Sequence, residues 1–177
     1  MSSATRIRLT DVLWLVPWTL SEELPVERTF VMVKPDGVQR GLVGEVIRRF
    51  ERKGLKLAAL KMVQLSRDQA VQLYSVHRER PFFEDLIQFV CSGPVVAMVW
   101  EGPEVVAVAR RLIGATNAAE AAPGTVRGDF GISTQMNLVH ASDSPVSVAR
   151  ELPVVFDEHE LVSYQQTIQP WLGHDAS

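Results

Sequence analysis

Residues 29–37 read Thr-Phe-Val-Met-Val-Lys-Pro-Asp-Gly, an apolar run that passes without a gap into turn residues. The first five side chains are apolar or β-branched, which is typical of a buried strand. Pro, Asp and Gly then supply strong turn chemistry, so we expect the strand to end in a tight loop. Beyond the loop, Leu42, Val46 and Phe50 recur at helical spacing, and Gly54 is placed to cap the helix. This succession of strand, loop and amphipathic helix indicates a mixed α and β architecture.

The rest of the chain continues this succession. We expect further strands at residues 55–65, 95–100 and 136–140. Helices are expected to begin at Ser66, after Pro81, near Pro103 and at Ser144-Pro145, where Ser is a favourable N-cap and Pro fits the first helical position. The resulting order is strand, helix, strand, helix, helix, strand, helix, strand, helix. It predicts an α+β fold, a ferredoxin-like α/β sandwich with a four-stranded antiparallel sheet.

The amino-terminal part differs from the domain that follows it. We expect residues 1–26 to form an extension and residues 27–177 to form the domain, because residues 21–25 are a polar stretch that breaks regular structure. The apolar run 12–20 contains Pro17 and is far shorter than the roughly 20 residues needed to span a bilayer, so no membrane partner is expected. Its apolar area predicts that the extension packs on its own or a neighbouring subunit. A disordered leader or a misassigned start is the alternative.

Charge and cysteine content limit the partners and the compartment. The 177 residues include 18 basic and 21 acidic side chains, for a net charge of −3, which argues against nucleic acid as the main partner. The single cysteine, Cys91, follows Phe89 and Val90 and is predicted to be a buried structural thiol. One cysteine cannot form a disulfide within the chain, so a reducing, cytoplasmic location is expected.

The most informative chemistry lies in residues 137–145, which read Asn-Leu-Val-His-Ala-Ser-Asp-Ser-Pro. This order puts His140 at the end of a strand, facing a turn of small polar residues and the amino end of a helix. Backbone N–H groups and the helix dipole favour anions at such a place. Taken alone, His140 could equally be a structural histidine with Ser142 to Ser144 as ordinary caps.

Four other motifs accompany this segment in a fixed order. They are Lys-Pro-Asp-Gly-Val-Gln-Arg-Gly at 34–41, Arg-Pro-Phe-Phe at 80–83, Ser-Gly-Pro-Val-Val at 92–96 and Pro-Gly-Thr-Val-Arg-Gly-Asp-Phe at 123–130. Together with the histidine segment, they make residues 27–171 resemble the nucleoside diphosphate kinase family. The first 26 residues lie outside the resemblance.

The resemblance implies a ping-pong phosphoryl transfer through a phosphohistidine at His140. A neutral imidazole is nucleophilic near pH 7, and its P–N bond is labile enough to pass the phosphoryl group on. Glu151 is implied to accept the Nε2 proton so that Nδ1 can attack, and Ser142 is implied to help hold the pair. From the sequence alone, Glu151 could be a carboxylate on a solvated helix face.

The resemblance also implies a nucleotide-binding set. Cations that bind the phosphates are expected because phosphoryl transfer depends on positioning and charge stabilisation. The phosphate-binding residues implied are Lys34, Arg110 and Arg127, with Thr116 adding a hydroxyl and Tyr74 orienting the reacting group. Phe82 is implied to stack on the base, with Thr134 opposite where the family usually has valine, and Asn137 with Lys34 to contact the sugar 3′-hydroxyl. No phosphate-binding loop of the P-loop type is present, so side chains must hold the phosphates.

Cofactor and partners follow from the same resemblance. Mg²⁺ is expected to arrive on the nucleotide, with Asp143 as a partner through water. The expected small-molecule partners are nucleoside triphosphates and diphosphates, including ATP, GTP and other NTPs and dNTPs. A homo-oligomer is expected, and the loop 115–131 favours a hexamer over a tetramer, although Ala118 replaces a proline that the family commonly has there.

Three alternatives remain at this point. A catalytically silent relative would lack the histidine or the phosphate-binding side chains, and none of them is missing here. A ferredoxin-like RNA-binding module would carry aromatics on its strands, whereas these strands are aliphatic. Residues 127–129 spell Arg-Gly-Asp, a tripeptide of adhesion ligands, but three residues are a weak signal.

Overall fold

The computed structural model describes residues 27–168 and 171–172; the predicted extension, residues 1–26, lies outside the described part. One four-stranded sheet has the order β2-β3-β1-β4, and each neighbouring pair is antiparallel. Its strands are β1 (Glu27–Val33), β2 (Lys56–Val63), β3 (Val95–Gly102) and β4 (Val139–Ala141). This arrangement confirms the predicted α+β fold with a four-stranded antiparallel sheet.

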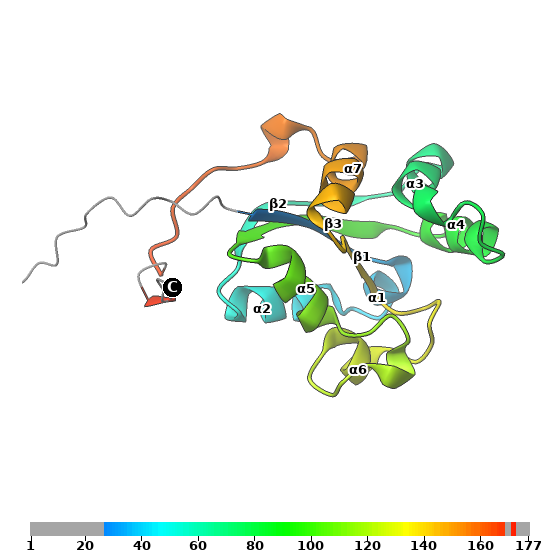
Figure 1. The fold of residues 1–177 in the computed structure, drawn as a ribbon, viewed down its shortest axis with the longest axis horizontal. Helices are drawn as coiled ribbons and strands as arrows, with labels where there is room; N and C mark the ends of the chain where they lie inside the picture. The colour runs from blue at the N-terminus through cyan, green and yellow to red at the C-terminus, as the bar shows by residue number, and fades with distance from the viewer. Residues whose placement is uncertain (1–26, 169–170, 173–177) are drawn as a thin grey trace, which may run out of the picture.

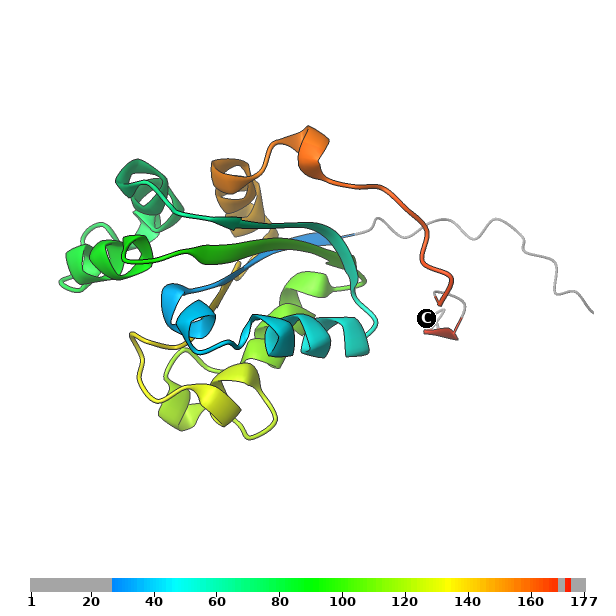
Figure 2. The same cartoon turned by 180° about the vertical axis from the view of Figure 1, so that it is seen from behind.

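Helices cover both faces of the sheet (Figures 1 and 2). One face carries α3 (Arg67–Leu73), α4 (Phe83–Cys91) and α7 (Pro145–Val155), and the other carries α2 (Val43–Arg52), α5 (Val105–Ile113) and α6 (Val126–Phe130). Strand β1 divides its side chains between the two cores. Phe30 and Met32 pack toward α3, α4 and α7, whereas Val31 and Val33 pack toward α2 and α5. All four are 0% exposed, as the period of two in a strand requires when both faces are covered.

Local sequence signals place the helix ends. Ser66 starts α3 with a capping box, in which its hydroxyl accepts from the backbone of Gln69 and the Gln69 side chain accepts from the backbone of Ser66. Ser144 caps α7 by accepting from the backbone of Ser147, and Pro145 occupies the first helical position. Ser144 therefore fixes where α7 begins, four residues after the strand that carries His140 ends at Ala141.

Three sequence-based expectations differ from the structure. The turn after β1 is a short helix, α1 (Pro35–Gln39), because Pro35 is preset for a first helical position. Strand β4 starts only at Val139, since Leu138 has a φ of 72° that breaks the extended backbone. Cys91 is half-buried rather than buried, because it lies at the last residue of α4.

The loop 114–131 and the residues after α7 complete the described chain. The loop contains two short helices, η3 (Ala118–Glu120) and α6. After the short η4 (Glu158–Glu160), the chain runs beside β2, and the Val162 N–H donates to the Ala58 carbonyl at 2.8 Å. None of the helices in the described ranges combines the length and the apolar character needed to cross a membrane.

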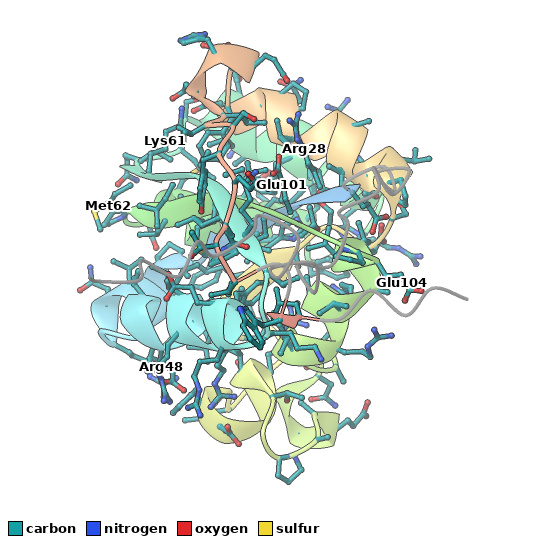
Figure 3. All side chains as sticks on the ribbon, turned by 90° about the vertical axis from the view of Figure 1, so that its left-hand side faces the viewer. Arg28, Arg48, Lys61, Met62, Glu101 and Glu104 are labelled. Carbon is teal, nitrogen blue, oxygen red and sulfur yellow. The ribbon has the colours of Figure 1, made fainter. Side chains whose placement is uncertain are left out.

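Ion pairs gather at the end of the sheet where β1 begins (Figure 3). Glu101 is buried and accepts from Arg28 at 2.9 Å and from Lys56 at 2.8 Å. On the neighbouring edge strand β2, Leu60 and Met62 are 46% and 60% exposed. Strand β2 therefore exposes apolar side chains at Leu60 and Met62, beyond the part near Ala58 that the chain after α7 covers.

Candidate active site

The site is built around His140 in the middle of β4, opposite Met32 of β1. Its Nε2 lies 2.7 Å from Oε2 of Glu151 on α7, and the Ser142 hydroxyl donates to the same oxygen at 2.8 Å. A carboxylate can only accept in this geometry, so Nε2 carries the proton and Nδ1 keeps a free lone pair. The structure therefore brings together the three predicted residues His140, Glu151 and Ser142.

Two aromatic rings hold the imidazole in place. Tyr74 meets it edge-on at 5.4 Å between ring centroids, and Phe30 packs beneath it at 6.0 Å. Burial raises the pKa of the Tyr74 phenol above its usual value of 10, and its hydroxyl is buried without a hydrogen-bond partner in the described chain. Tyr74 therefore packs a protonated phenol against the His140 ring, with a buried hydroxyl whose hydrogen-bonding capacity is unused in the described chain.

The electrostatics favour a neutral imidazole. Burial lowers the pKa of His140, Glu151 opposes this, and the positive charges of Lys34 and Arg127 lower it further. Burial raises the pKa of Glu151, but the hydrogen bonds from His140, Ser142 and Arg150 outweigh that effect and hold its pKa below the usual value. The pair is thus a neutral ring beside an ionised carboxylate, the state in which Nδ1 is a nucleophile.

A second group lies between α1 and the turn before β4. The Lys34 ammonium donates to Oδ1 of Asn137 at 2.7 Å, and the Asn137 amide donates to the Thr116 carbonyl at 2.9 Å. Lys34 is 6% exposed, and burial together with the charge of Arg127 lowers its pKa to about 8. Hydrogen bonds therefore already connect Lys34, Asn137 and the backbone of Thr116 in the described chain. The Thr116 hydroxyl makes no hydrogen bond to the described residues.

Two predicted arginines donate to the backbone around His140. Arg127 is 3% exposed and donates to the carbonyls of Gly114 at 2.9 Å and Val139 at 2.7 Å. Burial and the charge of Arg110 lower the pKa of Arg127 to about 10. Arg110, on α5, donates to the Ala141 carbonyl at 3.3 Å. Both guanidinium groups therefore bracket the backbone on either side of His140, where they raise the local positive potential.

The remaining predicted residues lie farther out. Phe82 is 51% exposed before α4, and its ring lies 5.7 Å from the ring of His77. Thr134 is exposed in the loop before β4 and donates to Asn117 at 3.3 Å. Asp143 is exposed, accepts from the hydroxyls of Ser144 and Ser147, and has a pKa lowered chiefly by Ser147. Within the described chain, no hydrogen bond, ion pair or ring contact joins Phe82, Thr134 or Asp143 to His140.

The family of the chain follows from comparison with known proteins. A family model described as nucleoside diphosphate kinase matches residues 27–161. The chain belongs to the nucleoside diphosphate kinase family. A nucleoside diphosphate kinase of Carboxydothermus hydrogenoformans is 58% identical over 147 residues, which cover 83% of this chain and 99% of the relative. One from Archaeoglobus fulgidus is also 58% identical, over 83% of this chain and 97% of its own length.

Solved nucleoside diphosphate kinases share the fold. The halophilic enzyme of Halobacterium salinarum, solved in complex with CDP, has a TM-score of 0.82 and 46% identity, over 84% of this chain and 99% of that chain. A family protein of Babesia bovis has a TM-score of 0.80 and 48% identity, over 83% and 99% of the two chains. The similarity therefore covers the domain that carries the nucleoside diphosphate kinase motifs.

Sequence reasoning missed two charged residues of this nucleoside diphosphate kinase domain. Arg150 donates to Oε1 of Glu151 at 2.8 Å, so both carboxylate oxygens are engaged. Asp36 accepts from the backbone N–H of Leu138 at 3.0 Å. Arg150 stands beside Glu151 in the sequence, which was a usable signal, whereas the contact of Asp36 spans 102 residues and has no sequence signature.

The structure also bears on the alternatives. Arg127 of the Arg-Gly-Asp tripeptide is 3% exposed, so its guanidinium is not presented as an adhesion ligand would require. Helices cover both faces of the sheet, so an RNA-binding sheet surface is not open in the described chain (Figure 1). The phosphate-binding and nucleophilic candidates of the nucleoside diphosphate kinase pattern are all present, unlike in a silent relative.

Proposed function

We propose that this member of the nucleoside diphosphate kinase family carries the phosphoryl group on Nδ1 of His140. Nucleoside diphosphate kinase activity is the function of the chain. The observation that carries the mechanism is the contact of 2.7 Å between Nε2 of His140 and Oε2 of Glu151. It fixes the tautomer in which Nδ1 has the free lone pair, and the depressed pKa of His140 keeps that lone pair unprotonated at neutral pH.

In the first half-reaction, the Nδ1 lone pair attacks the γ-phosphorus of a nucleoside triphosphate. The P–N bond forms while the bond from phosphorus to the β,γ-bridging oxygen breaks, and the nucleoside diphosphate leaves with that electron pair. The imidazole gains positive charge, which the Glu151 carboxylate offsets through the Nε2 proton. In the second half-reaction, a terminal oxygen of another diphosphate attacks the phosphorus, and the P–N electrons return to Nδ1.

The cations around the ring supply the charge stabilisation that phosphoryl transfer needs. Arg110 and Arg127 donate to carbonyls of the strand that carries His140, Lys34 holds Asn137 just before that strand, and the Tyr74 ring packs edge-on against the imidazole. We assign them to the phosphates, with Thr116 adding a hydroxyl. Burial lowers the pKa of Lys34 to about 8 and that of Arg127 to about 10, and an anion bound beside them would stabilise their charged forms.

The nucleoside is assigned to residues on the two sides of the site. The Lys34 ammonium and the Asn137 side chain are already hydrogen-bonded at 2.7 Å, and both can also hydrogen-bond to a sugar 3′-hydroxyl. The exposed ring of Phe82 offers a stacking face, and the methyl group of Thr134 can pack on the opposite side of a base. Stacking tolerates every base, at on the order of 1–3 kcal/mol, so ATP, GTP and other nucleotides are expected as substrates. The CDP complex of the Halobacterium salinarum relative supports a diphosphate here.

The donor set near His140 fits Mg²⁺ that is carried by the nucleotide. Asp143 is a single exposed, ionised carboxylate, and the described ranges hold no group of three or more acidic, histidine or cysteine side chains that could cage a metal. Mg²⁺ keeps several waters and binds few protein carboxylates, so Asp143 would hold it through water. Bound Mg²⁺ would neutralise phosphate charge, and the protein residues would supply the alignment.

The experiment for this function is a coupled assay with ATP and dTDP on wild-type protein, His140→Ala and His159→Ala. His159 lies in η4, is exposed, and serves as the matched histidine-to-alanine control. Wild type and His159→Ala should turn over alike, and His140→Ala should lose turnover while keeping its circular dichroism spectrum. Turnover retained in His140→Ala would exclude His140 as the carrier.

We propose a cytoplasmic homo-oligomer, and a hexamer in particular. The exposed side chains of Leu60 and Met62 on the edge strand β2 support contact with a second copy, because apolar groups exposed on an edge strand are typical of interaction surfaces. The loop 115–131 is ordered by η3 and α6, and Ala118 is 6% exposed despite lacking the ring of a proline. Light scattering tests the assembly, and a mass below a hexamer would refute it.

A further inference from the structure

The backbone turns sharply at Leu138, two residues before His140. Leu138 has a φ of 72°, and the N–H of Val139 donates to the carbonyl of Asn137 at 2.9 Å. A bond across three residues with positive φ at the centre is the rarer and more strained form of γ-turn. A leucine resists this conformation because its Cβ approaches the following carbonyl. Leu138 is also 0% exposed, so the core needs its side chain although its backbone is strained.

The segment after β1 clamps this γ-turn from the outside. The Leu138 N–H donates to Oδ2 of Asp36 at 3.0 Å, and the Leu138 carbonyl accepts from the Lys34 N–H at 2.8 Å. The Lys34 ammonium holds the Asn137 side chain at 2.7 Å. A Cβ at Gly37 would lie 2.9 Å from the Leu138 carbonyl oxygen, so the two segments are in direct backbone contact. One short stretch therefore grips both sides of the turn.

Asp36 has a role in this clamp that no other described group fills. The N–H at the centre of a γ-turn has no partner inside the turn, and a buried N–H without an acceptor is costly. Without the carboxylate, Leu138 would gain by returning to negative φ, and the peptide between Asn137 and His140 would have to rotate. The separation and direction of these two side chains would then change together.

We infer that Asp36 is a positioning residue for phosphoryl transfer: its carboxylate locks the γ-turn at Leu138 and so fixes His140 relative to the Lys34–Asn137 pair. The inference rests on the proposed role of His140. Asp36 acts through the backbone and need not contact the nucleotide. It explains why a turn residue of the Lys-Pro-Asp-Gly stretch matters to the start of β4, where Leu138 lies 102 residues after Asp36.

The test measures single-turnover phosphorylation of the full chain by radiolabelled ATP. A misplacement of about 1 Å can cost on the order of 100-fold in rate, so Asp36→Ala should slow phosphorylation by roughly 10- to 100-fold. Asp36→Asn keeps an oxygen that can accept from the Leu138 N–H, and it should recover most of the lost rate. Asp36→Glu keeps the charge but moves the accepting oxygen by one methylene group. Its phosphorylation should therefore be slow as well.

A matched pair separates backbone positioning from loss of packing. Leu138→Gly and Leu138→Ala each remove the same buried side chain apart from one methyl group, but only glycine adopts positive φ without a Cβ penalty. In the Asp36→Ala background, the glycine variant should therefore phosphorylate faster than the alanine variant, by about fivefold or more. If Asp36 only stabilised the fold, its loss would lower the melting temperature, but the Leu138→Gly and Leu138→Ala variants would be phosphorylated at the same rate once corrected for the fraction of folded protein.

Asp157→Ala is the control for loss of an aspartate at the start of a helical turn, because Asp157 is exposed, precedes η4 and hydrogen-bonds through its backbone N–H to Glu160 at 2.8 Å. It should phosphorylate at the wild-type rate. Suppose that wild type is labelled normally on His140. An unchanged phosphorylation rate in both Asp36→Ala and Asp36→Glu would then overturn the role of Asp36 but leave the proposed function intact, and so would equal rates for the two Leu138 variants. Labelling of wild type at a residue other than His140 would overturn the proposed function as well.

Discussion

Replacing Glu151 by glutamine is the sharpest perturbation of the histidine pair. The side chain is 5% exposed, with Oε2 shared by His140 and Ser142 and Oε1 held by Arg150 at 2.8 Å. An amide can direct its oxygen toward His140 only by pointing its NH₂ group at the guanidinium of Arg150, which sets two donors against each other. The reverse orientation forces Nε2 to accept and moves the proton to Nδ1, the nitrogen that must attack.

The expected fall in the phosphorylation rate of Glu151→Gln follows from the loss of the carboxylate charge. A hydrogen bond to an ionised group is roughly twice as strong as a neutral one, a difference of about 1 to 2 kcal/mol. At about 1.4 kcal/mol per factor of ten, the phosphorylation rate should fall roughly 5- to 30-fold, and further in molecules with the wrong tautomer. The affinity for ATP should change little, because Glu151 faces the ring and not the solvent.

Quenched-flow single-turnover labelling with ATP measures this rate directly. Glu158→Gln is the matched control, since Glu158 is 81% exposed in its side chain and pairs only with Arg28 in the described chain. Both variants should keep the wild-type melting temperature within a few degrees, and only Glu151→Gln should be slow. A rate within twofold of wild type in folded Glu151→Gln would refute the assignment of Glu151 to the nucleophile.

Three further predictions concern the same network. On the acid side, kcat/KM should fall only below pH 6.5, because burial lowers the pKa of His140 from 6.5 and only the neutral ring attacks. On the alkaline side, kcat/KM should fall as the pH rises through about 8, because Lys34 of the free enzyme loses its charge there. A constant kcat/KM up to about pH 9 would contradict the role of Lys34. Dideoxynucleotides should phosphorylate the protein much more slowly than deoxynucleotides, since Lys34 and Asn137 lose a shared partner, and equal rates in a stopped assay would remove the sugar assignment. Arg150→Met should slow phosphorylation by about 3- to 10-fold by freeing one oxygen of Glu151, and an unchanged rate would show that Arg150 is dispensable.

The fold was predictable because local signals agreed with the global arrangement. The apolar run at 29–33, the Ser66 capping box and the Ser144-Pro145 helix start all act over a few residues, and each appears in the structure as expected. The antiparallel sheet followed from the order of the elements, since four strands with intervening helices fit few two-layer arrangements.

The finer features of the site depend on contacts between distant segments. The early start expected for β4 was wrong because Leu138 has a positive φ, and its backbone is hydrogen-bonded to Asp36 and Lys34, which lie about 100 residues earlier. The residues named for the site came from motif resemblance, and the structure adds how they are linked. Arg127 illustrates the difference: the sequence suggests a phosphate ligand, whereas the structure also shows it holding the Val139 carbonyl at 2.7 Å.

Identification of the phosphorylated atom tests the central claim most directly. Wild-type protein is incubated with radiolabelled ATP, digested under alkaline conditions, and the labelled peptide is analysed by mass spectrometry and phosphorus NMR. The account predicts one acid-labile, alkali-stable phosphoryl group, on Nδ1 of His140, that is discharged by added nucleoside diphosphate. Phosphate on Nε2, on another residue, or on no residue while turnover continues would contradict it.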